Sequence, residues 1–195
     1  MSNNRVTVKG RIETNFMLDH DYYYERFYQL LLAIKRSSGA VDVIPVIVSE
    51  RLIDVSKDLT GHYVSIVGEF RSFNYHGDSK NKLLLYIFPL KIEVISEPDN
   101  INDILIQGVL CKEPVLRETP YGRVITDVLL AVNREYNKSD YIPAIAWGRN
   151  AYFISSLHRG TVIRAAGRIQ SRNYNKYGSV MTAYEISLNL VETVT

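Results

Sequence analysis

The chain contains one pattern twice, at a spacing of about 98 residues. Gly10 and Pro45 stand 35 positions apart, and Gly108 and Pro143 repeat that separation. Each glycine follows a short hydrophobic segment, and each proline belongs to an Ile-Pro motif downstream of a Leu-Leu-Ala motif. A shared register of this length indicates two copies of one domain, so the fold of each copy must fit into about 100 residues.

We expect two domains, residues 1–97 and 101–195, joined by a short polar linker. The hydrophobic fraction of 46% is enough for two cores, and no apolar run of about 18 residues predicts a membrane span. Because the N-terminus lacks the apolar stretch of a signal peptide, we expect a cytoplasmic protein with no membrane partner. The single cysteine, Cys111, excludes an internal disulfide and a cysteine-rich metal site, and we expect no cofactor.

Each copy shows strand-like alternation in five segments and helical periodicity in one. The first copy predicts strands at 6–12, 27–35, 42–48, 63–73 and 82–93, with a helix at 50–58. The second predicts strands at 104–110, 123–133, 141–147, 161–172 and 180–191, with a helix at 149–157. Five strands with a helix between the third and fourth is the order of an OB fold, a five-stranded barrel that commonly binds single strands and sugars. The predicted fold class is therefore all-β, with two tandem OB folds.

The net charge of +2 is small, but its distribution is informative. Residues 1–98 hold 12 basic and 12 acidic side chains, whereas residues 99–195 hold 11 basic and 9 acidic ones. The stretch 141–184 contains several arginines and no acidic residue at all. A field of one sign is typical of a surface that binds a polyanion.

The predicted fourth strand of the second copy concentrates this charge on one face. Because side chains alternate along a strand, Arg164, Arg168, Arg172 and Tyr174 share one face, and small apolar residues share the other. Same-face residues lie about 6.6–7 Å apart, close to the step of an extended nucleotide chain. The alternative interpretation is the solvated outer face of a half-buried strand.

Aromatic residues accompany these arginines. Tyr141 and Trp147 share a face of the predicted third strand, and Tyr136 and Tyr174 fall in hairpins. Rings interleaved with cations favour single-stranded nucleic acid, because any base can stack on a ring and arginine neutralises phosphate. The alternative for Trp147 is a core residue, and the alternative for the hairpin tyrosines is turn packing. The predicted nucleic-acid-binding residues are Arg117, Arg123, Arg134, Tyr136, Tyr141, Trp147, Arg164, Arg168, Arg172, Tyr174, Lys176 and Tyr75.

The first copy lacks most of these side chains. The residues equivalent to the three arginines, to Tyr141 and to Trp147 are Ser65, Glu69, Phe73, Val43 and Ser49. Only Tyr75 matches its counterpart, Tyr174. We therefore expect an eroded ligand face in the first domain, which is weaker for nucleic acid and available as a pairing or partner surface.

Catalytic motifs are not found in the sequence. The four histidines are scattered without metal-ligand spacing, and there is no nucleophile elbow, phosphate loop or paired-carboxylate motif. We therefore expect that this protein is not an enzyme.

The second copy resembles the bacterial single-stranded DNA-binding protein family. The segments that carry the resemblance are 107–110, 116–122, 130–134, 141–148 and 167–174, and they span almost the whole copy. The resemblance implies an OB fold and sequence-independent binding of single-stranded DNA in replication, repair or recombination. It also implies that Tyr136, Tyr141, Trp147 and Tyr174 are the stacking residues.

The resemblance further implies assembly, since the family usually brings four OB folds together. A chain with two OB folds would reach that number as a homodimer. Family members typically carry a long tail with an acidic tip that recruits other proteins, whereas this sequence ends directly after the last predicted strand, so we expect no recruitment by that route. Two alternatives remain: a binder of single-stranded RNA, and an OB-fold scaffold in a replication or primosome complex.

Overall fold

The computed structural model describes residues 3–76, 81–96, 99–176 and 178–194. The first half contains β1 (Asn4–Ile12), β2 (Met17–Tyr22), β3 (Glu25–Lys35), β4 (Val41–Ser49), β5 (Tyr63–His76) and β6 (Asn81–Ile95). The second half contains β7 (Asn102–Leu110), β8 (Val115–Glu118), β9 (Val124–Asn133), η1 (Glu135–Asn137), β10 (Ser139–Trp147), α1 (Arg149–Ser155), β11 (Val162–Lys176) and β12 (Ser179–Thr193). All ten predicted strands are confirmed, and β2 and β8 are additional.

Strand pairing closes each half into a five-stranded barrel. The first barrel has the order β1-β3-β4-β6-β5 and returns to β1, and the second has the order β7-β9-β10-β12-β11 and returns to β7. Neighbours are antiparallel except for the pairs β4–β6 and β10–β12. This is the strand order of an OB fold, so the predicted fold class is confirmed.

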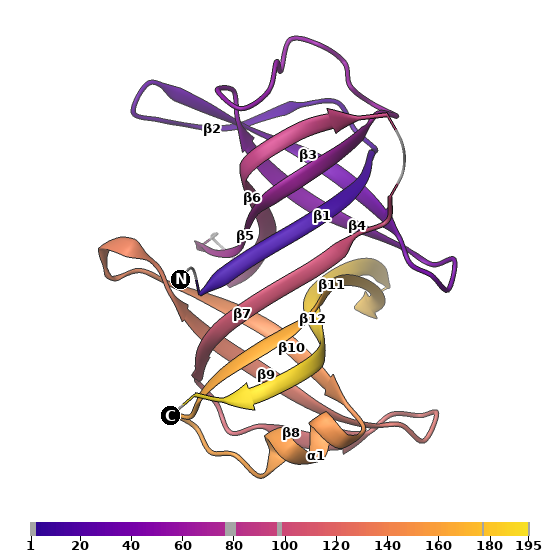
Figure 1. Ribbon diagram of the computed structural model, residues 1–195, viewed down its shortest axis with the longest axis vertical. Coiled ribbons are helices and arrows are strands. Elements are labelled where there is room, and N and C mark those ends of the chain that lie inside the picture. The colour runs from indigo at the N-terminus through magenta and orange to yellow at the C-terminus, as the bar shows by residue number, and fades with distance from the viewer. Residues whose placement is uncertain (1–2, 77–80, 97–98, 177, 195) are drawn as a thin grey trace.

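The two barrels share one continuous sheet, because β1 pairs with β7 in antiparallel register from Asn4↔Ile106 to Val8↔Asn102. Figure 1 shows these two strands side by side between the barrels, with α1 at the end of the second barrel that lies away from the first. Buried apolar side chains fill the interiors, with Leu30 and Phe70 in the first barrel and Leu130 and Ile169 in the second. The alternation of strand residues therefore separates a packed interior from an outer face in both halves.

The helix predicted at 50–58 is wrong, because this segment folds into turns and bends. Its short polar side chains bond to the nearby backbone instead: Asp54 Oδ1 accepts from the Ser56 amide at 3.1 Å, and Asp58 Oδ1 accepts from the Thr60 amide at 2.9 Å. Such local bonds compete with helical hydrogen bonding. The equivalent segment of the second half has no aspartate and forms α1, which buries Ala151 and Ile154 against the barrel.

Gly68 and Gly167 occupy the point where β5 and β11 face an irregularity in their partner strands. The register of β11 with β12 shifts between Ala166 and Gly167, and β5 shows the same shift between Val67 and Gly68. A methyl group at Gly167 would overlap the backbone carbonyl oxygen of Ser187, and one at Gly68 would overlap that of Phe88. The close approach of two backbones therefore requires glycine at both positions.

Gly167→Ala is expected to lower the free energy of unfolding by about 2 kcal/mol, because backbone cannot yield as a flexible side chain does. Urea denaturation measures this change. Gly178→Ala is the control, since its φ is +78° but nothing lies within 4 Å of an added methyl, so backbone strain alone costs about 1 kcal/mol there. A smaller effect at Gly167 than at Gly178 would contradict the steric explanation.

Candidate nucleic-acid interface

Strand β11 has the two faces that its alternation predicts. Ile163, Ala165 and Ile169 are buried in the barrel, whereas Arg164, Arg168 and Arg172 are exposed on the outside. Gln170 is the exception on the outer side, since it is buried and donates to Glu185 Oε1 at 2.8 Å. The three arginines therefore lie in one row, interrupted by a packed glutamine.

Strands β10 and β12 extend this outer surface. Trp147 and Arg168 both lie beside Ser187 of β12: the indole N–H donates to Ser187 Oγ at 3.2 Å, and Arg168 pairs with Ser187 across the strands. Tyr141 lies further along the same side of β10 and is 41% exposed. Tyr174, near the end of β11, is 37% exposed. We name Tyr141, Trp147, Arg168, Arg172 and Tyr174 the second-barrel face.

Trp147 is half-buried on this face and is not a member of the barrel core. Its strand neighbour on β9 is Ile125, and Ile145 is two residues away on the same side of β10. Both isoleucines are buried although they point away from the barrel interior. The indole is therefore supported by an apolar base and held by one hydrogen bond, which fixes its orientation on the surface.

Acidic partners reduce the positive charge that the sequence indicates for this region. Arg172 Nε lies 3.8 Å from Glu185, and Arg164 Nη1 lies 3.3 Å from Glu192. Both acids belong to β12, just beyond the acid-free stretch. Arg117 pairs with Asp127 of β9 in the same way, and this neighbour raises the pKa of its guanidinium. The pairs of Arg164 and Arg117 are exposed on both sides and contribute little stability, and the Arg172–Glu185 contact is long, so a phosphate can replace the carboxylate at small cost.

The remaining predicted residues are more dispersed. Arg134 is only 27% exposed and lies 3.2 Å from the buried carboxylate of Asp140. Because Asp140 bonds to the first half of the chain, Arg134 lies near the contact between the two halves. Arg123 and Lys176 are exposed. Tyr75 is 54% exposed but belongs to the first barrel, and the side chain of Tyr136 lies outside the described part of the chain. The roles predicted for all twelve residues stay predictions.

The first barrel carries aromatic residues that a position-by-position comparison of the copies does not find. The Phe27 and Phe88 ring centroids lie 6.0 Å apart, and the guanidinium carbon of Arg71 lies 3.7 Å from the Phe88 centroid. Tyr86 is on the same side of β6, and its partial burial raises the pKa of its hydroxyl. With Phe73 of β5, these residues form what we name the first-barrel face. The sequence signal for this face was the two-residue spacing of Arg71 and Phe73 on β5 and of Tyr86 and Phe88 on β6, which places each pair on one side of its strand.

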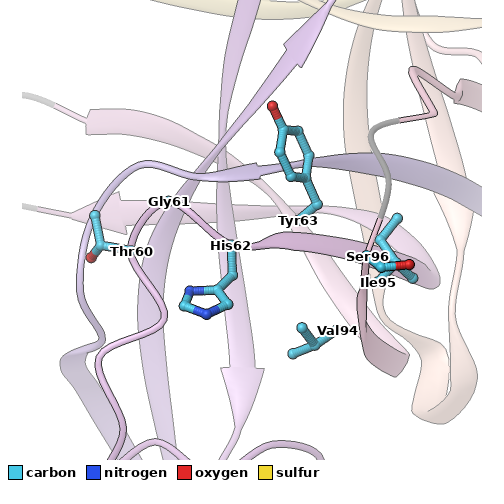
Figure 2. Close-up of a pocket in the computed structure, with 7 residues that line it drawn as sticks. All are labelled: Thr60, Gly61, His62, Tyr63, Val94, Ile95 and Ser96. Carbon is cyan, nitrogen blue, oxygen red and sulfur yellow. The ribbon is translucent and has the colours of Figure 1, made fainter.

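The hollow in Figure 2 lies on the first half, where β5 begins and β6 ends. It is lined by 60–63 and 94–96. Figure 2 shows His62 and Tyr63 pointing to opposite sides of the chain, so their polar groups do not converge on one point. We assign no ligand to this hollow. Within the described residues, no helix is long and apolar enough to cross a membrane.

Comparison with known proteins bears on the second half of the chain. Residues 101–194 match the model of the Single-strand binding protein family. The C-terminal half of this chain is therefore similar to that family. The matched residues include the whole second-barrel face, so the family similarity and the candidate interface concern the same surface.

Two relatives of this half of the chain illustrate the similarity. The chain is 32% identical over 100 residues to Single-stranded DNA-binding protein A of Bacillus subtilis, covering 47% of this chain and 58% of the relative. It is 34% identical over 94 residues to the Single-stranded DNA-binding protein of Enterococcus faecalis, covering 44% and 50%. The chain therefore spans about half the length of the curated relatives that it matches.

The fold of the entire chain is similar to a solved structure, that of the wild-type single-stranded DNA binding protein from Thermus aquaticus. The TM-score is 0.81 at 19% identity, and the match covers 98% of this chain and 93% of the other. At this identity the likeness concerns the fold. It supports the arrangement of both barrels in one chain.

Proposed function

We propose that this protein binds single-stranded DNA without sequence specificity, in replication, repair or recombination, and that it is a binding protein rather than an enzyme. In this proposal residues 1–97 and 101–195 are two OB-fold domains, and the second does most of the binding. The observation that carries the proposal is the second-barrel face, where exposed tyrosines and a supported indole alternate with Arg168 and Arg172. The single-stranded DNA-binding relatives named above match this half of the chain.

The proposed mechanism combines stacking with charge neutralisation. Tyr141, Trp147 and Tyr174 offer rings on which bases stack, and each stacked base contributes about 1–3 kcal/mol regardless of its identity. Arg168 and Arg172 neutralise phosphates by exchanging weak contacts with Gln170 and Glu185 for charge-assisted bonds. Arg117 and Arg123 extend the positive track along the hairpin that β8 and β9 form. Stacking accounts for sequence tolerance, and the arginines account for the preference for a polyanion.

The first-barrel face supports a secondary part in the same activity. Arg71 and the neighbouring rings of Phe88 and Tyr86 provide a cation and flat surfaces in a region equivalent to the second-barrel face. Most of this surface is already occupied by contacts among its own side chains, because Phe27 and Phe88 are packed together. We therefore propose that the first barrel adds weaker contacts to a strand held by the second.

A fluorescence titration tests the proposed function, because Trp147 is the single tryptophan of the chain. We expect poly-dT to quench its emission, with weaker effects from poly-U and from duplex DNA. If about four phosphates are neutralised, log affinity should fall with log salt at a slope near −3. Light scattering on the same samples distinguishes a monomer from the homodimer with four barrels that we also propose.

Three other outcomes would change the proposal. A salt-independent affinity would contradict the role of the arginines. Tighter binding of poly-U than of poly-dT would favour an RNA ligand. An unchanged emission together with no mobility shift of labelled poly-dT would reject nucleic-acid binding and favour a protein-interaction scaffold.

A further inference from the structure

Two buried aspartates occupy equivalent positions in the two halves. Asp42 is the second residue of β4 and Asp140 is the second residue of β10, and both are 0% exposed. A buried carboxylate needs hydrogen-bond donors around it, since burial without them is costly. The main donors to both carboxylates include a backbone amide from the opposite half of the chain.

The hydrogen bonds cross between the halves in both directions. Asp42 Oδ1 accepts from the Ser171 amide of β11 at 2.8 Å, and the Val43 amide donates back to Ser171 Oγ at 3.1 Å. Asp140 Oδ1 accepts from the Ser72 amide of β5 at 2.7 Å, and the Tyr141 amide donates back to Ser72 Oγ at 2.8 Å. The two sites thus repeat one arrangement, in which an aspartate of one half and a serine of the other bond to each other's strands.

These bonds arise because β5 and β11 continue past the ends of their pairing with β1 and β7. The pairing of β11 with β7 ends at Gly167, so the following amides on that edge have no strand partner. Asn102 Oδ1 accepts from the Ile169 amide at 2.9 Å, and Asp42 takes the next one, Ser171. Buried backbone donors require acceptors, and here side chains provide them where the sheet has ended.

The same order holds in the first barrel. The pairing of β5 with β1 ends at Gly68, Asn4 Oδ1 accepts from the Phe70 amide at 3.1 Å, and Asp140 accepts from Ser72. In each barrel the asparagine comes from the same half and the aspartate from the other half. Of these two side-chain acceptors, the aspartate is therefore the one that links the extended strand to the neighbouring barrel.

The serines lie next to the residues of the two faces. Ser171 directly precedes Arg172, and Ser72 stands between Arg71 and Phe73. Tyr141, whose amide completes one of the crossed sites, belongs to the second-barrel face itself. A shift of these backbone segments would therefore move a cation or a ring on each face.

We propose that Asp42 and Asp140 are positioning residues that act across the halves: Asp42 holds the β11 segment of the second-barrel face, and Asp140 holds the β5 segment of the first-barrel face. Neither face is fully arranged by its own barrel. The consequence for ligand binding rests on the proposed function, whereas the crossed positioning itself does not. The competing explanation is that each aspartate acts only within its own half, through Arg36 or Arg134.

Amide hydrogen exchange on the full chain tests the crossed arrangement without any ligand. Asp42→Ala is expected to accelerate exchange at the Ser171 amide by about tenfold or more while leaving Ser72 unchanged, since a bond to a charged acceptor is lost. Asp140→Ala should do the reverse. Asp54→Ala, which removes an exposed acid of the first half, is the control and should change neither amide.

A milder variant keeps the test decisive if Asp42→Ala does not fold. Ser171→Ala removes only a hydroxyl and should accelerate exchange at the Val43 amide in the opposite half, by about tenfold. Exchange changes confined to the half that carries the substitution would overturn the proposal.

Titration with poly-dT adds the functional arm. In Asp42→Ala we expect affinity to fall about fivefold to tenfold and the salt slope to shrink by about 0.7, the share of one phosphate, because Arg172 is displaced. If the original protein binds no poly-dT, the proposed function fails. Hydrogen exchange still tests whether each aspartate holds the strand of the other half. If it binds poly-dT but Asp42→Ala leaves the Ser171 amide protected, the crossing fails and the proposed function stands.

Discussion

Replacing Arg168 and Arg172 together by glutamate is expected to weaken the binding of poly-dT by about 100-fold or more at physiological salt. A hydrogen bond to a charged group contributes about 1.5–3 kcal/mol, and two are lost in this variant. The new carboxylates would also repel phosphate, next to Glu185 on the neighbouring strand. Titration of Trp147 emission at several salt concentrations measures both the loss and the expected decrease in salt slope.

Arg159→Glu is the matched control for this variant. It makes the same kind of substitution once, and so half of the charge change, in the same half of the chain, on an exposed residue between α1 and β11 that lies outside the second-barrel face. Its affinity for poly-dT should stay within about threefold of the original value, since an exposed charge outside the contact acts mainly through the screened field. Equal losses in both variants would indicate a general charge effect and reject the specific face.

The second large effect is expected from Asp42→Asn, which should lower the free energy of unfolding by about 3 kcal/mol. Arg36 donates to both carboxylate oxygens of Asp42, from Nε at 2.6 Å and from Nη2 at 2.5 Å. An asparagine keeps one acceptor oxygen but removes the charge, so the partly buried guanidinium loses its partner. Urea denaturation at neutral pH measures the loss.

Asp140→Asn is the internal comparison and should cost less than about 1 kcal/mol. Arg134 is near Asp140 but badly aligned, and among the described residues neither Arg134 Nε nor Asp140 Oδ2 has a hydrogen-bond partner. Burial raises the pKa of the Asp140 carboxyl in spite of the Ser72 amide and the charges of Arg134 and Arg71. A neutral amide at this position keeps an acceptor for Ser72 and avoids burying a charge. A larger loss at Asp140 than at Asp42 would contradict this ranking.

Because the pKa of Asp140 is raised, the stability loss in Asp140→Asn should depend on pH. A carboxyl with a raised pKa in the folded state binds its proton more tightly there than in the unfolded chain. Its contribution to stability is complete below the unfolded pKa of about 3.9 and is lost as pH rises through the folded value. The free energy of unfolding of the original protein, relative to that of Asp140→Asn, should therefore be higher at pH 4 than at pH 7. A difference that instead increases with pH would contradict a raised pKa at Asp140.

Several features could be predicted because they are local. The ten strands and the two faces of β11 follow from alternation, which depends only on residues two positions apart. The helix at 50–58 was wrong because Asp54 and Asp58 form turn bonds that periodicity does not register. The first-barrel face was missed because its rings lie at positions that are not aromatic in the second copy. Phe88, for example, is equivalent to Ser187.

The sequence alone determined the repeat, the two OB folds and the strand that carries the arginines, because register and alternation are written in neighbouring residues. Only the tertiary structure decided which charges are available. In the folded chain, arginines of the acid-free stretch lie beside Glu185 and Glu192 of β12. Arg134 lies beside a buried aspartate, Asp140. It also decided the crossed bonds of Asp42 and Asp140, which join residues 129 and 68 positions apart. Such contacts depend on the pairing of β1 with β7, which sets how the two barrels meet, and no local pattern specifies that pairing.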